Sequence, residues 1–389
     1  MSLPNLLFIT PSMPSPLGTG SMLRAAMTLE ALRKRFRVHV LNFNNWSWGS
    51  GRPSFLLNRA ASYAELPNVQ GDVDTSTLLD RFFPGVDFVA IHTFKLVMAR
   101  VAVGVLASMK GAHPYLVLDL DDDECTRGAR VLDRMEQDSD VEAVKNGRAH
   151  EVHLRMLEKM MAPRFNAICL AGIDDCSVVQ ARYPRIAVHH LPNAIDIPDN
   201  SEVRAVHFER TPEANILFVG ALYYAPNADG ICYFVEQVLP IVQEMTNGSV
   251  TLRVVGADPP RRVTQLAQNP SVTIHPNVPA VAPFYEKANL CIVPLRVGSG
   301  TRIKILEAFS YRRPVVSTHL GAEGLAVKDG EQLLLADEPE AMARACATLM
   351  TDHAMRDRMV GSAYEWVFRN HTVANVEAAL DSIYRPVLN

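Results

Sequence analysis

Three features are missing from this sequence, and each absence excludes a class of protein. The longest apolar stretch, residues 96–109, is interrupted by Arg100 and is shorter than the roughly 20 residues that a helix needs to cross a bilayer. The 38 lysines and arginines stand against 42 acidic residues, a formal net charge of −4, which argues against a protein that coats nucleic acid. The six cysteines show no Cys-x-x-Cys spacing, which argues against a structural zinc site.

The cysteines and the N-terminus together indicate a compartment. Cys169, Cys232 and Cys291 lie in apolar runs, where a thiol is usually a small buried hydrophobe, so we expect a reducing environment. The chain opens with Met-Ser-Leu-Pro and enters a short apolar run without a charged leader segment. We therefore expect a cytoplasmic protein.

What the sequence does contain is a regular alternation of short apolar runs and longer helical patterns. It has 389 residues, of which 48% are hydrophobic and 21% charged, which fits a globular protein of two or three domains. Continuous apolar strands separated by helices are typical of parallel sheets covered on both faces. The strands predicted in the first half are residues 6–10, 38–43, 88–92, 115–120, 167–170 and 187–191.

A second series follows a polar connector near residues 192–213. It predicts strands at residues 216–220, 250–255, 272–275, 290–294, 315–318 and 332–335, and helices at residues 229–245, 281–288, 302–311, 338–350, 355–369 and 373–384. We predict an α/β protein with two tandem, doubly wound Rossmann-like domains, residues 1–195 and 196–370, and a C-terminal helix in residues 371–389 that packs back toward the first domain. Ligands of such sheets bind beyond the carboxyl ends of the strands, so we expect the site in the cleft between the domains.

The segment of residues 294–308 carries the strongest chemical signal. A buried strand ends at its first residue, and a loop with Gly298 and Gly300 follows. Ser299 or Thr301 can then cap the next helix, because a side-chain oxygen there accepts from the free N–H groups of the first turn. Glycines allow a ligand to approach those N–H groups closely.

The first turn of this helix carries Arg302 and Lys304. Cations at a helix N-terminus cost about 0.3–1 kcal/mol each unless an anion is present. Free N–H groups, glycines and two cations together describe a phosphate or diphosphate site. Glu307 lies one turn deeper on the same face, where a carboxylate can accept from a ribose diol. The alternative is that both cations are solvated and that Glu307 simply pairs with Lys304.

The same segment carries a family resemblance. Together with residues 309–318 and 321–325, it resembles the donor-site signature of glycosyltransferase family 4 (group 1), and the variant resembles the sugar transferases of bacterial exopolysaccharide gene clusters. The resemblance covers most of residues 215–370 and reaches the first half through Gly18, Gly20, Arg24 and His92. It implies the GT-B fold and a retaining, metal-independent sugar transfer from a nucleotide diphosphate sugar, without a cofactor.

Two departures from the family pattern matter. The usual Glu-x7-Glu motif has Ser299 in place of its first glutamate, which leaves Glu307. The Arg and Lys that usually follow the first strand of the second domain are also absent: Ala221, after Gly220, stands in the place of the Arg. Arg302 and Lys304 are our candidates to replace them.

The resemblance also implies roles for other residues. Arg302 and Lys304 would stabilise the negative charge on the departing nucleoside diphosphate. The donor would further be bound by Gly18, Gly20, Gly220, Val278, Gly298, Ser299, Gly300, Thr301 and Glu307. His92, expected at the end of its strand, would point into the cleft and position the sugar or stabilise the transition state. On the acceptor side we place Arg24, Asp121 and Asp122.

Two charged runs leave alternatives open. Residues 119–124 contain an Asp-x-Asp, which suits a hard cation such as Mg²⁺, but acidic residues after a strand also cap helices, and Asp121 or Asp122 could face an acceptor. We assign no metal. The basic residues 33–37 suit a helix C-terminus, and they also leave open a peripheral contact with the inner face of a membrane.

Three functions are compatible with these sequence features. The first is transfer of a sugar to a hydroxyl acceptor, which could be a glycan, a lipid-linked or a small molecule. The second is a nucleotide-sugar 2-epimerase, for which Glu307 alone offers few acid/base groups. The third is a non-catalytic protein that binds nucleotide sugars. None involves nucleic acid.

Overall fold

The chain divides into two α/β units, each with its own sheet. The structure, a computed structural model, describes residues 3–44, 54–67, 74–109, 111, 113–137, 141–195, 214–247, 250–298 and 302–388. One unit consists of Met1–Ala194 together with Val373–Asn389, and the other of Ile195–Thr372. Both contain only parallel strand pairs among their described residues, as expected for doubly wound sheets.

The first unit is built on a seven-stranded sheet with the order β3-β2-β1-β4-β5-β6-β7. Its strands are β1 (Asn5–Thr10), β2 (Arg37–Asn44), β3 (Ser62–Pro67), β4 (Ala90–Phe94), β5 (Tyr115–Asp121), β6 (Ala167–Leu170) and β7 (Ala187–His190). Its helices are α1 (Gly20–Leu32), α2 (Ser54–Leu57), α3 (Leu78–Phe82), α4 (Ala99–Ser108), α5 (Glu124–Gln137), α6 (Val141–Met161), α7 (Ile173–Arg182), α15 (Val373–Ile383) and α16 (Arg385–Leu388).

The second unit is built on a six-stranded sheet with the order β10-β9-β8-β11-β12-β13. Its strands are β8 (Ala214–Val219), β9 (Val250–Gly256), β10 (Val272–Pro276), β11 (Leu290–Val293), β12 (Val315–Ser317) and β13 (Leu334–Leu335). Its helices are α8 (Ala225–Tyr233), α9 (Leu239–Met245), α10 (Arg261–Thr264), α11 (Ala282–Lys287), α12 (Ile303–Ser310), α13 (Pro339–Thr351) and α14 (His353–Asn370).

Each sheet has apolar side chains on both faces, which is why its strands read as continuous hydrophobic runs. In β1, Leu7 and Ile9 belong to one buried cluster, whereas Leu6 and Phe8 belong to another. The second cluster includes residues of α1 and α15, so the C-terminal segment covers one face of the first sheet. The second unit shows the same alternation in β8.

Three elements differ from the sequence-based expectation. β4 runs from Ala90 to Phe94 instead of over 88–92, so His92 lies in the middle of the strand and not at its end. β3 was missed, because this edge strand mixes polar and apolar residues and ends at Pro67. The helix expected over 229–245 begins earlier, at Ala225, and contains a π turn over Phe234–Val238 just before Pro240, which has no N–H to donate.

No helix among the described residues combines the length and the apolar character needed to traverse a bilayer.

Candidate functional site

The start of α12 is the feature around which the predicted phosphate site is organised. The residue that caps α12 is Arg302, whose backbone is extended and whose side chain makes no capping hydrogen bond. The N-cap position is therefore Arg302, and not Ser299 or Thr301 as expected. Ser299, Gly300 and Thr301 themselves lie outside the described residues, so their donor contacts stay predictions.

Gly298 is needed at its position for two local reasons. Its φ is +118°, in the region that residues with a side chain rarely adopt. A Cβ placed there would also lie 3.1 Å from Nη2 of Arg302. The loop and the guanidinium therefore pack closely, and Arg302 is buried. This packing brings one of the two predicted cations against the glycine loop.

Lys304 turns toward the end of β8. Its Nζ donates to Oδ1 of Asn227 at 2.6 Å and lies 4.6 Å from the ring centroid of Phe218. A Cβ on Gly220 would lie 2.8 Å from the same ammonium, so the two residues are neighbours. Burial, together with the nearby Arg302, lowers the pKa of Lys304 to about 7. The cation thus lies beside the stretch where the family's Arg and Lys are missing.

Glu307 has a different partner. Its Oε2 accepts from the hydroxyl of Tyr285 at 2.9 Å, and Tyr285 stacks on Tyr311 with 5.2 Å between the ring centroids. Burial raises the pKa of Glu307, against the lowering effects of Tyr285 and Lys304. Since Lys304 donates to Asn227 and Glu307 accepts from Tyr285, the alternative of a simple Lys304–Glu307 pair is wrong.

Sequence reasoning missed Asn227 and Arg296. Asn227 holds Lys304 and also donates from Nδ2 to the carbonyl of Ala221 at 2.8 Å. Arg296 forms a two-pronged ion pair with Asp229, at 3.0 and 2.6 Å. The position of Arg296 three residues after the end of β11 was the available signal, because polar residues beyond strand ends often serve a site.

Val278 follows β10 and is half-buried against the apolar cluster that contains Tyr285. The preceding Asn277 has a φ of +53°, so the chain turns sharply there. The proposed contact of Val278 with a base stays a prediction.

The residues expected near Arg24 form a buried network in the first unit. Arg24 is fully buried, and its Nη2 lies 2.8 Å from Oδ1 of Asp119, while its Nη1 donates to Oδ1 of Asn193 at 2.8 Å. Burial favours a lower pKa for Arg24, but the two nearby carboxylates outweigh this and raise it. The guanidinium of Arg24 is therefore engaged within the first unit, and its role on the acceptor side stays a prediction.

His92 belongs to the same network. It is fully buried, its Nδ1 lies 2.8 Å from the hydroxyl of Tyr384, and its Nε2 lies 3.5 Å from Oδ2 of Asp119. Phe8 packs edge-on against its ring. The prediction that His92 ends its strand is wrong, because β4 continues to Phe94. Its contact with the donor sugar stays a prediction.

Asp121 and Asp122 share a cation. Nζ of Lys95 lies 2.9 Å from Oδ2 of Asp121 and 3.2 Å from Oδ1 of Asp122. Asp121 has a φ of +67° and sits at an irregularity in the pairing of β5 with β6. Their role on the acceptor side stays a prediction. Their shared ion pair with Lys95 already explains why two acidic residues follow each other here.

Gly18 and Gly20 also have local explanations. Gly18 has a φ of +122°, and a Cβ there would lie 2.7 Å from Sδ of Met22. Gly20 opens α1, whose cap Thr19 accepts from the N–H of Met22 at 3.4 Å. Their donor contacts stay predictions.

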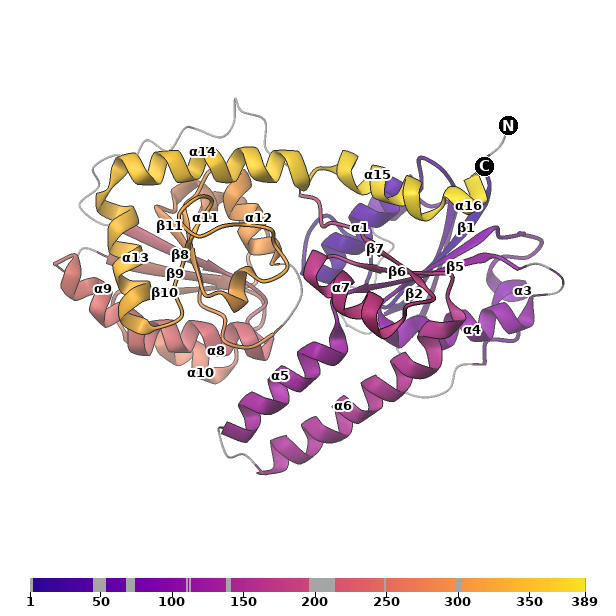
Figure 1. Cartoon of the computed structure of the whole chain (residues 1–389), viewed down its shortest axis with the longest axis horizontal. Coiled ribbons are helices and arrows are strands. Elements are labelled where there is room, and N and C mark those ends of the chain that lie inside the picture. The colour runs from indigo at the N-terminus through magenta and orange to yellow at the C-terminus, as the bar shows by residue number, and fades with distance from the viewer. Residues whose placement is uncertain are drawn as a thin grey trace. The chain divides into compact units, whose positions relative to one another are not determined.

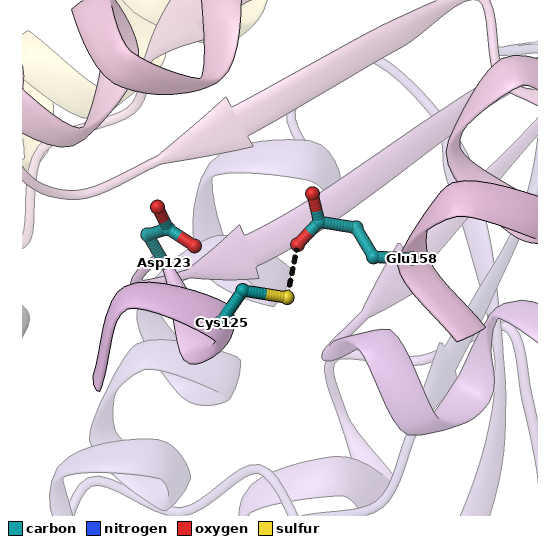
Figure 2. Close-up of side chains that lie close together, drawn as sticks. All are labelled: Asp123, Cys125 and Glu158. Atoms are coloured by element: carbon teal, nitrogen blue, oxygen red, sulfur yellow. Dashed lines mark hydrogen bonds between the residues drawn. The ribbon is translucent and has the colours of Figure 1, made fainter. Parts of the chain in front are cut away.

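One group of side chains has the composition of a metal site. Asp123, Cys125 and Glu158 offer ligand atoms that all lie within 4.8 Å of one another (Figure 2). However, Sγ of Cys125 donates to Glu158 at 2.9 Å, and Arg182 donates to Asp123 at 2.8 Å and to Glu158 at 2.5 Å. Burial and the neighbouring Glu158 raise the pKa of the Cys125 thiol, which disfavours the thiolate that a metal requires. The guanidinium thus already compensates both carboxylates.

Comparison with known proteins bears on the second unit directly. Residues 213–352 match the family model described as "Glycosyl transferases group 1". The second unit contains a group 1 glycosyltransferase domain. This confirms the family resemblance seen at residues 294–325. A curated relative, an "Uncharacterized 44.6 kDa protein in cps region" of Klebsiella pneumoniae, is 22% identical over 174 residues, which are 43% of this chain and 45% of the relative.

Solved structures extend the likeness to the whole chain. A sucrose-phosphate synthase from Thermosynechococcus elongatus has a TM-score of 0.71 at 16% identity, with 98% of this chain and 99% of that chain covered. Anabaena HepE, solved with UDP and glucose, has a TM-score of 0.65 at 14% identity, with 98% and 99% covered. At such low identity these matches show the fold, and they confirm the predicted GT-B architecture with two Rossmann-like domains.

Proposed function

We propose that this chain is a glycosyltransferase that moves a sugar from a nucleotide diphosphate sugar to a hydroxyl acceptor. The observation that carries the proposal is the start of α12, where a capping Arg302 and a first-turn Lys304 lie within a group 1 glycosyltransferase domain. Two cations at a helix N-terminus are unfavourable by themselves and become favourable when a diphosphate binds there. HepE, which shares the fold, was solved with UDP, which supports a nucleotide-linked donor.

The reaction would use these groups as follows. Departure of the nucleoside diphosphate from the anomeric carbon places negative charge on the phosphate oxygens. Arg302 and Lys304 would stabilise that charge, and Gly298 and Gly220 would let the phosphates approach backbone N–H groups. Lys304 is well suited to this, because its hydrogen-bond partner Asn227 is a neutral amide and not a carboxylate. Glu307, oriented by Tyr285, would accept from the ribose.

Retention of the anomeric configuration and independence of metal are part of the proposal. Metal independence is supported by the ion pairs of residues 119–124. Asp119 pairs with Arg24, Asp121 and Asp122 with Lys95, and Asp123 with Arg182. The acidic run therefore has cationic partners from the protein, and the positive potential for the diphosphate would come from α12.

Two other functions use the same nucleotide-sugar site. A 2-epimerase needs acid/base groups around the sugar, and the deep burial of His92 removes one candidate for that task. A non-catalytic nucleotide-sugar-binding protein would use α12 for binding alone. Sugar transfer is favoured by the group 1 glycosyltransferase domain.

The test is a panel of nucleotide sugars, incubated with the protein and hydroxyl acceptors in the presence of EDTA and analysed by mass spectrometry. Transfer to an acceptor in EDTA is the expected result, and NMR of the product reports whether the configuration is retained. An isomerised nucleotide sugar would instead identify an epimerase, and binding without turnover under every acceptor would identify a binding protein. Activity restored by Mg²⁺ after EDTA treatment would contradict metal independence.

A cytoplasmic location, with peripheral contact at the inner face of a membrane, completes the proposal. The basic residues 33–37 are poor candidates for that contact. Lys34 and Arg35 pair with Glu377, and Arg35 also pairs with Asp381. These charges join the turn after α1 to α15 within the first unit.

A further inference from the structure

Helix α6 carries an exposed apolar stripe that nothing in the proposed chemistry uses. Val152, Met156 and Met160 have exposed fractions of 53%, 58% and 48%. They are spaced four residues apart, so they lie above one another on one side of the helix. α6 packs along α5, and the two helices extend together away from the strands of the first unit (Figure 1).

The opposite side of α6 is fixed in the protein. Leu154 and Leu157 are buried in the main apolar cluster of the first unit, and Glu158 is buried against Arg182. At about 100° per residue, these side chains lie across the helix from the stripe. The orientation of α6 is therefore set by packing, and the stripe faces outward as a consequence.

The charges beside the stripe are basic. The same rotation places Lys145 and Lys159 within or next to it, and both residues are exposed. Glu158 lies on the buried side, and the carboxylate of Glu151 accepts from Arg155. Between residues 145 and 160, the face that carries Met156 thus combines apolar and cationic side chains.

We propose that this face of α6 docks onto an anionic lipid surface. Val152, Met156 and Met160 would enter the boundary between headgroups and acyl chains, while the lysines would contact lipid phosphates. A second copy of the chain fits less well, because two such faces would bring like charges together. The inference rests on the part of the proposed function that places the chain at a membrane, and it is independent of the donor chemistry.

Vesicle sedimentation tests the proposal with the full chain. Vesicles of equal parts phosphatidylcholine and phosphatidylglycerol should bind the wild type, and pure phosphatidylcholine should bind it weakly. The double variant Met156→Gln/Met160→Gln should bind anionic vesicles about tenfold more weakly, because two inserted apolar side chains are lost. Lys159→Glu should weaken binding about fivefold or more and flatten its salt dependence.

Leu57→Gln is the matched control, because Leu57 is as exposed as Met156, at 58%, and lies in the same unit. Its binding should equal that of the wild type. The proposal is overturned if the wild type ignores anionic vesicles, or if Leu57→Gln weakens binding as much as the double variant. It is also overturned if light scattering shows an oligomer that the double variant dissociates, since the stripe would then join copies of the chain. Calorimetry of nucleotide binding on the same variants should be unchanged, which separates this result from a failure of the donor site.

Discussion

The ammonium of Lys304 is held 2.6 Å from the side-chain oxygen of Asn227, a neutral group. A carboxylate partner would cancel the positive charge, whereas an amide orients the ammonium and leaves the charge available to an anion. Asn227 is itself held, since it donates to the carbonyl of Ala221. The arrangement fits a side chain whose positive charge is favoured when a phosphate binds.

Lys304→Ala should reduce kcat about a hundredfold or more and weaken donor binding less. Charge on the leaving group peaks in the transition state, so the loss falls mainly on turnover. Steady-state kinetics together with calorimetry of donor binding separate the two effects. Lys328→Ala, on an exposed side chain, should change neither. Equal losses in turnover and affinity would count against a role in the transition state.

The lowered pKa of Lys304 predicts proton uptake when a nucleoside diphosphate binds. At about pH 8 the side chain is mostly neutral in the free protein, since its pKa is about 7, and a bound anion favours its charged form. Calorimetry in buffers of different ionisation enthalpy should report uptake approaching one proton in the wild type and less in Lys304→Ala. Equal uptake by both proteins would assign the proton to another group.

The lowered pKa of Lys304 also makes the free energy of unfolding depend on pH. Its pKa in the folded protein lies below the ordinary value of 10.5, so the unfolded chain binds more protons between about pH 7 and that value. Its contribution to the free energy of unfolding therefore rises with pH across this window. Lys304→Met should flatten that rise in urea unfolding curves, and an unchanged pH dependence would contradict the assignment.

Glu307→Ala should weaken donor binding about tenfold to a hundredfold, because a hydrogen bond to a charged group contributes about 1.5–3 kcal/mol. Calorimetry measures it directly. Tyr285→Phe is the informative companion, since it keeps the carboxylate and removes the hydroxyl that orients it. It should weaken binding less than Glu307→Ala does. Unchanged affinity in Glu307→Ala would remove this residue from the site.

The sequence predicted the fold well because its signals are local. β6 was predicted over 167–170, its observed range, and the start of β11 at Leu290 was predicted as well, because short buried runs of a parallel sheet end abruptly at polar loops. The phosphate-site signal was local too, since Arg302 and Lys304 stand within three residues of each other.

The partners of these residues could not be predicted, because they are distant in the sequence. Lys304 meets Asn227, 77 positions away, and His92 meets Tyr384, 292 positions away. From the sequence alone, Arg24 resembled a surface residue of an ordinary helix. Tertiary packing places Asp119, 95 positions away, beside it. A two-residue shift of β4 was enough to move His92 from a strand end into the core.

Gly298→Ala should impair donor binding out of proportion to its effect on stability. It introduces a side chain at a φ of +118° and 3.1 Å from the Arg302 guanidinium, so the backbone is strained and the guanidinium must move slightly away. Gly330→Ala is the matched control, because Gly330 also has a positive φ, +74°, but has open space around its Cβ position. Both variants should lose about 1 kcal/mol of stability. Only Gly298→Ala should lose affinity, and similar affinity in both variants would exclude the loop from the site.

Asp119→Asn should lower the free energy of unfolding by about 3–5 kcal/mol, because it removes the nearer charged partner of the buried Arg24 and leaves it with Asp121, at 3.4 Å. Burial alone would raise the pKa of Asp119, but Arg24 and His92 outweigh it and hold that pKa well below its usual range. A carboxyl group with a depressed pKa stabilises the fold above its unfolded value of about 4, and this contribution is lost as the pH falls through the acid range. Urea unfolding from neutral to acid pH should therefore show a flatter decline in the variant than in the wild type. Asp337→Asn, on an exposed side chain, is the control and should keep the wild-type decline. If the stability of Asp119→Asn fell with pH as steeply as that of the wild type, the buried pair would contribute no net stability.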